Sequence, residues 1–155
     1  MRITSRTLLL PLAALALVAA CDDPTEVGEH MDIEGVALEV AGTEIYRYTL
    51  DDGLPSALAL DIGAYEAAIV FLDHDGDPIT HAHEEGEEGE QLDVTISDPA
   101  VLTWTPETEA GHEHEALEFH GELNALQAGE TSMSICILHG EHCDFEVDIP
   151  VTVGQ

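Results

Sequence analysis

The stretch TSMSICILHGEHCDFEVDIPVTV, residues 131–153, decides the fold class of this chain. Apolar and polar side chains alternate on both sides of residues 139–142, and in the second half the apolar positions are Phe145, Val147, Ile149, Val151 and Val153. Successive side chains of a β-strand point to opposite faces, so this period of two predicts two half-buried strands. Residues 139–142 then form the tip of a hairpin between them.

The same alternation recurs upstream of this hairpin. It predicts further short strands near residues 36–40, 45–50, 58–62, 92–96, 101–105 and 116–120, and the near-continuous apolar run 67–72 predicts a central strand. With turn signals roughly every ten residues and no amphipathic helix, the pattern is typical of an all-β, antiparallel sandwich or barrel. Two segments, 81–91 and 106–115, are too rich in charged residues and glycine to pack, and we expect them to be loops.

Two short motifs add a family resemblance. Asp98-Pro99-Ala100-Val101 opens one strand, and Ala128-Gly129-Glu130-Thr131 turns into the alternating strand that follows. This succession resembles the second half of a bacterial Ig-like domain of group 2, and residues 58–63 resemble the opening strand of that domain. The likeness covers about residues 57–153, although Ala125 stands where the family usually has glycine. The resemblance implies an Ig-like β-sandwich used for adhesion, spacing or binding at the cell surface, and no catalysis.

The first twenty residues predict export. Arg2 and Arg6 precede the apolar run 8–20, which is too short to span a bilayer, since a span takes about 20 residues. Val18-Ala19-Ala20-Cys21 resembles a bacterial lipobox, which implies cleavage before a lipid-modified Cys21. The alternative is an ordinary signal peptide that ends at a chance cysteine.

The lipobox reading divides the chain into three parts. These are a signal peptide (1–20), a disordered, lipid-anchored N-terminal tether (21–35) and an Ig-like domain (36–155). The acyl chains on Cys21 would anchor the protein to a bacterial membrane, on its periplasmic or extracellular face.

The charge of the chain limits its partners. All 33 acidic residues follow residue 20, where Arg47 is the only basic residue, so the mature part carries a net charge of −32 with its histidines neutral. Such a surface repels phosphate backbones, and we expect no nucleic-acid binding. It attracts cations such as metal ions or basic peptides; a saline habitat is an alternative explanation of the same charge.

Histidines provide the candidate chemistry. They form three groups, His81 with His83, His112 and His114 with His120, and His139 with His142. Imidazoles combined with a carboxylate or thiolate match the ligand preference of Zn²⁺, and copper or nickel would also fit. If residues 112–120 form one strand, the three histidines of the second group share a face. The alternative is that all these histidines are scattered polar residues of acidic loops.

The densest group of potential ligands lies at the hairpin tip. Cys136 and Cys143 flank it, and an exported protein favours a disulfide between them over a pair of metal-binding thiolates, provided that their Cα atoms come within about 7 Å. A disulfide leaves His139, His142 and Asp144 as the main predicted metal site. The full set of candidate ligands is His139, His142, Asp144, His112, His114, His120, His81 and His83.

Two functional hypotheses follow. The first is a lipid-anchored envelope protein whose clustered histidines bind zinc or copper and buffer or relay it. The second is a non-catalytic Ig-like adhesion or scaffold module whose histidines are incidental. No nucleophile or general base stands out, so we expect no enzyme. The segment Asp73-His74-Asp75-Gly76-Asp77 hints at a calcium loop, but its glycine is misplaced for an EF-hand, and a turn is the better interpretation.

Overall fold

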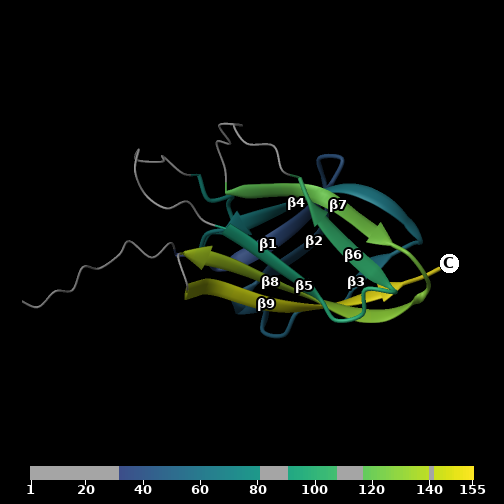
Figure 1. The fold of residues 1–155 in the computed structure, drawn as a ribbon. Helices are drawn as coiled ribbons and strands as arrows, with labels where there is room; N and C mark the ends of the chain where they lie inside the picture. The colour runs from purple at the N-terminus through teal and green to yellow at the C-terminus, as the bar shows by residue number, and fades with distance from the viewer. Residues whose placement is uncertain (1–31, 81–90, 108–116, 140–141) are drawn as a thin grey trace, which may run out of the picture.

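The structure is a computed structural model that describes residues 32–80, 91–107, 117–139 and 142–155 of the chain. Two β-sheets pack face to face and account for most of these residues (Figure 1). The predicted signal peptide and residues 21–31 of the predicted tether lie outside the described residues. The strands are β1 (Gly35–Val40), β2 (Thr43–Thr49), β3 (Leu58–Leu60), β4 (Gly63–Leu72), β5 (Gln91–Ile96), β6 (Leu102–Pro106), β7 (Glu118–Ala125), β8 (Gly129–His139) and β9 (His142–Val153).

The strand order is that of an Ig-like sandwich. One sheet has the order β2-β1-β4-β7-β6 and the other the order β3-β9-β8-β5. The neighbours β4-β7-β6 and β9-β8-β5 reproduce the arrangement of the two immunoglobulin sheets, with β1 beside β4. The all-β sandwich predicted from the period of two is therefore confirmed.

One edge of the sandwich differs from the antiparallel expectation. β3 pairs with β9 in parallel, with Leu58 opposite Val151 and Leu60 opposite Val153. The chain leaves β2, turns through a short 3-10 segment (Leu50–Asp52) and crosses to the second sheet in the same direction as β9. Alternation in the sequence predicts that a strand exists but carries no information about the direction of its neighbour.

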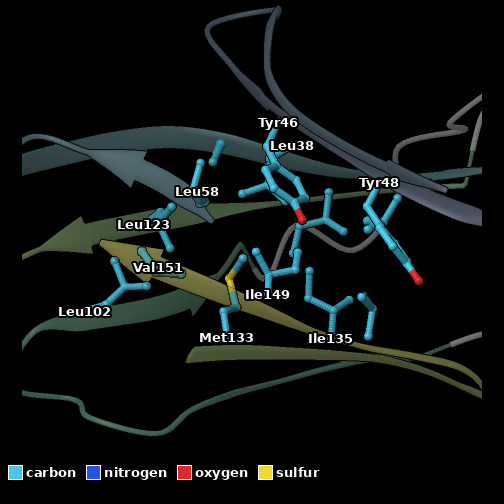
Figure 2. Close-up of a cluster of buried hydrophobic side chains, with 14 of the residues drawn as sticks. Leu38, Tyr46, Tyr48, Leu58, Leu102, Leu123, Met133, Ile135, Ile149 and Val151 are labelled. Atoms are coloured by element: carbon cyan, nitrogen blue, oxygen red, sulfur yellow. The ribbon is translucent and has the colours of Figure 1, made fainter. Parts of the chain in front are cut away.

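The core lies between the sheets and is filled by the alternating positions. Met133, Ile135 and Ile149 are fully buried, and Figure 2 shows them facing Leu38 and Tyr46 of the opposite sheet. The ring of Phe71 meets those of Phe119 and Phe145 edge to face, at centroid distances of 6.0 Å. Burial of apolar surface at about 25 cal/mol per Å² is the main term that stabilises such a layer.

The strand predicted near residues 116–120 corresponds to β7, which continues to Ala125. β7 begins at Glu118, and Leu117 lies before it in a bend. The backbone N–H of Leu117 donates to the carbonyl of Ile79 at 2.7 Å, and its own carbonyl accepts from Phe71 at 3.1 Å. Leu117 is thus held both by Phe71 of β4 and by the segment that follows β4.

Candidate functional site

The hairpin tip between β8 and β9 is organised by a bulge and a disulfide. The register places His139 opposite His142 and Leu138 opposite Cys143, with a shift between Ile137 and Leu138. Cys136 and Cys143 are joined by a disulfide, with their Cα atoms 5.9 Å apart. With both sulfurs in this bond, neither cysteine is a thiolate ligand, and the alternative set of two cysteines and two histidines is not formed.

The described part of the tip contributes two of the three predicted ligands. The side chain of His142 is exposed, and Asp144 is half-buried. The side chain of His139 lies outside the described residues, as do residues 140–141. Within the described ranges, no group of three or more His, Cys, Asp or Glu side chains is arranged to hold a metal ion.

His120 lies on β7 of the five-stranded sheet, whereas the hairpin tip belongs to the four-stranded sheet. The side chain of His120 is on the exposed outer face of β7. Its Nε2 is 3.1 Å from Oε1 of Glu118, two residues earlier on β7, and its register partner on β4 is Ala68. His112 and His114, which were predicted to share its face, lie outside the described residues, and so do His81 and His83. The grouping of these four with His120 or with the tip stays a prediction.

A groove that the sequence analysis missed runs beside His120. It has a volume of about 670 Å³, and its lining includes Ala67, Ala68 and Gly121. Its walls are acidic, with the side chains Glu39, Glu66, Glu107, Glu118 and Glu122 from β1, β4, β7 and the end of β6. The alternation Glu118-x-His120-x-Glu122 could have indicated one wall, but the pairing of β7 with β4 and β1 adds the others.

His74 belongs to a turn that is closed by hydrogen bonds of Asp73. Oδ1 of Asp73 accepts hydrogen bonds from the backbone N–H groups of Asp75 and Asp77, at 2.9 and 3.0 Å. The N–H of Asp73 donates to the carbonyl of Asp77 at 2.9 Å, which closes the turn. The Asp73 carboxylate thus satisfies the backbone of its own turn, as aspartate often does.

Arg47, the one basic residue of the described ranges, stabilises that turn from β2. Its guanidinium donates to the carboxylate of Glu44 and, at 2.7 Å, to the carbonyl of Gly76. The hydrogen bonds to Glu44 raise the pKa of Arg47 above its ordinary value. Arg47 therefore neutralises one carboxylate and leaves the groove acidic.

No family model matches the chain, and no curated protein matches it either, so the resemblance to Ig-like domains of group 2 has no support from family models. Among solved structures, domains 4 and 5 of the S-layer protein SbsC match 64% of the chain at 17% identity and a TM-score of 0.41. The chain spans about half of that structure, 48% of its length. The C-terminal domain of ZirS matches 99% of the chain and 88% of its own length, at 9% identity and a TM-score of 0.39. We draw no conclusion about function from likenesses this distant.

Proposed function

We propose that this chain is an exported, lipid-anchored Ig-like module of the bacterial cell envelope, with a scaffold or adhesion role and no catalysis. The observation that carries the proposal is the Ig-like strand order, in which the described candidate ligands are spread over different surfaces. His120 lies on the outer face of β7, whereas His142 and Asp144 lie at the tip of β8–β9. His74, which is not one of the candidate ligands, lies in the turn after β4. This distribution supports incidental histidines more than a metal centre.

Membrane attachment is the first part of this proposal. It is supported by the lipobox-like residues 18–21, and no helix in the described part of the chain is long and apolar enough to cross a membrane. Mass spectrometry of the N-terminal peptide from a membrane fraction should find acyl groups on Cys21. The variant Cys21→Ser should be found outside the membrane fraction or unprocessed. An unmodified Cys21 at a mature N-terminus would refute the anchor.

The scaffold role is tested by comparing a deletion of the whole sandwich with a variant that keeps the sandwich and lacks four histidines. Deletion of residues 36–155 should abolish the contribution of the protein to adhesion or envelope integrity. Replacement of His74, His120, His139 and His142 by Asn should leave that contribution unchanged, provided that the variant unfolds at the parent's temperature. Loss of the contribution in the folded histidine variant would favour metal binding over a scaffold.

Metal binding at the tip remains a second candidate, because the β8–β9 register places His139 opposite His142. We propose Zn²⁺ as the first ion to test, followed by Cu²⁺ and Ni²⁺. In calorimetry, His139→Ala with His142→Ala should abolish any tight site, whereas His74→Ala should not. A parent protein that binds none of these ions would eliminate this candidate.

A further inference from the structure

Two leucines on one loop stand out among the exposed apolar side chains of the described residues. Leu54 is 92% exposed and Leu50 is 52% exposed. They belong to residues 50–56 of the connection between β2 and β3, and we call these residues the leucine loop. A single exposed leucine needs no explanation, but two on a short, ordered loop form a compact apolar projection.

Hydrogen bonds from residues of β2 fix the backbone of the leucine loop. The hydroxyl of Tyr48 donates to the carbonyl of Gly53 at 3.0 Å, and that of Tyr46 donates to the carbonyl of Ser56 at 3.1 Å. Both tyrosine rings are buried in the core. The carboxylate of Asp52 accepts from the backbone N–H and the hydroxyl of Thr49, at 3.0 and 2.9 Å. The two leucines are therefore presented to solvent by an anchored backbone.

The leucine loop also lies where the chain enters the domain. The backbone N–H of Leu50 donates to the carbonyl of Glu34 at 2.8 Å, immediately before β1. Glu34 is 13 residues from Cys21 in the sequence, a contour of at most about 45 Å even when fully extended. If Cys21 carries the anchor, the loop stays within that distance of the bilayer surface.

We propose that the leucine loop inserts Leu50 and Leu54 into the surface of the bilayer that holds the lipid anchor. This inference rests on the proposed membrane attachment and adds the orientation of the domain. A contact of two side chains is weak in free solution, but the tether makes it intramolecular and raises the local concentration of the bilayer. Asp51 and Asp52 lie between the two leucines, so anionic headgroups oppose the contact and its lipid is zwitterionic, such as phosphatidylcholine.

The test is photocrosslinking of the full lipoprotein in phosphatidylcholine vesicles that contain a lipid with a diazirine in its acyl chain. Cross-links mapped by mass spectrometry should fall within residues 50–56. Leu50→Ser with Leu54→Ser should lower their yield by about tenfold or more, as expected when leucine burial is lost. Replacing part of the phosphatidylcholine by phosphatidylglycerol should lower the yield in the parent protein.

A matched control uses two apolar side chains that are exposed at the other end of the molecule. Ile62 and Leu126 are 50% and 51% exposed. They are the sequence neighbours of Gly63 and Ala125, which pair with each other at the first residue of β4. Leu72 is the last residue of that strand. Ile62→Ser with Leu126→Ser should leave the cross-links within residues 50–56 unchanged. Vesicle-bound protein without cross-links there, or an equal yield in both double variants, would overturn the inference.

Failure of the anchor can be told apart from failure of the leucine contact. Cys136 and Cys143 form a disulfide, so Cys21 supplies the remaining thiol of the three cysteines. If Cys21 carries no acyl groups in cells, the processed chain can be coupled through that thiol to a maleimide lipid and cross-linked in the same way. Cross-links that depend on the leucines would then support the contact while refuting the native anchor; their absence would overturn the contact itself.

Discussion

Gly121 shows how a single residue position constrains the packing of the five-stranded sheet. A Cβ at this position would lie 2.4 Å from Cζ2 of Trp104 and 2.7 Å from the carbonyl oxygen of Thr105. The indole lies against the backbone of β7 only because glycine leaves this space. We predict that Gly121→Ala lowers the free energy of unfolding by about 1–3 kcal/mol, since an overpacked site must shift ring or backbone.

Urea unfolding followed by the fluorescence of Trp104, the one tryptophan of the chain, measures this change. The control is Gly154→Ala, where the nearest atoms to the new Cβ are 3.7 and 3.8 Å away. The control should change the midpoint far less. Equal midpoints for Gly121→Ala and the parent would show that Trp104 can move without cost.

Tyr46 predicts a dependence of stability on alkaline pH. Burial raises the pKa of Tyr46 above its ordinary value, because the phenolate form loses water inside the protein. The neutral hydroxyl donates to Ser56, so at pH 7 Tyr46→Phe should cost about 1 kcal/mol. A raised pKa in the folded state means that this stabilisation is present below the unfolded pKa of about 10 and is lost as the pH rises through the folded pKa.

Denaturant titrations of both proteins between pH 7 and 11 check this expectation. The difference in unfolding free energy between parent and Tyr46→Phe should stay constant up to pH about 10 and shrink above it. A difference that grows with pH would contradict the assigned direction.

At the residue scale, the sequence predicted where side chains point better than what they bind. Phe145, Val147, Ile149, Val151 and Val153 are all buried, because alternation alone determines which face of a strand is apolar. The hydroxyl contacts of Tyr46 and Tyr48 to the leucine loop could not be predicted in this way. They depend on the path of the loop between the two sheets.

At the element scale, the β8–β9 hairpin carries the clearest stability prediction. The disulfide closes a short loop, since Cys136 and Cys143 are seven residues apart in the sequence. On the chain-entropy estimate, its removal by Cys136→Ala with Cys143→Ala should cost about 2 kcal/mol. Adding a reductant to the parent should lower its urea midpoint to about that of the double variant. The reductant should not change the midpoint of the double variant. A reductant effect in the double variant would point to a different origin.

The limits of the sequence prediction at this scale are physical. Each expected strand has a counterpart, but β7 lies at Glu118–Ala125 where residues 116–120 were expected. The apolar residues of its second half, Leu123 and Ala125, are separated from Phe119 by Gly121, which interrupts the pattern. The glycine that weakens the alternation is the one that the ring of Trp104 requires. Local alternation does not record such a contact between strands.

At the scale of the whole molecule, the acidic groove could not be predicted for the same reason. Glu39, Glu66 and Glu122 are far apart in the sequence, and strand pairing brings them to one surface. Composition predicted an acidic protein that attracts cations, but the distribution of that charge depends on the order β1-β4-β7. The grouping of the histidines stays a prediction for a related reason, because spacing along a chain does not define which loops meet.

This charge distribution predicts how stability depends on salt. Glu66 and Glu122 are direct register partners on β4 and β7, and like charges opposite each other destabilise a pair of strands. Residues 21–155 contain one basic residue, Arg47, against 33 acidic ones, so general repulsion adds to this local term. Screening by salt weakens both, and the melting temperature should rise by about 5 °C or more between 10 mM and 0.5 M NaCl.

The variant Glu66→Gln separates the local repulsion from the general one. It should stabilise the protein by about 0.2–1 kcal/mol at 10 mM NaCl, because it removes one of two opposed charges, and by less at 0.5 M, where screening has already weakened the repulsion. Glu130→Gln is the matched control, since Glu130 lies opposite Thr152 on the other sheet and loses only its share of the general repulsion. Thermal unfolding of the three proteins at both salt concentrations measures these differences.

If Glu66→Gln and Glu130→Gln stabilise equally, the repulsion comes from total charge and not from the pairing in the groove. If Glu66→Gln destabilises at low salt, that carboxylate holds a cation, and the groove is a binding site instead of a repulsive surface.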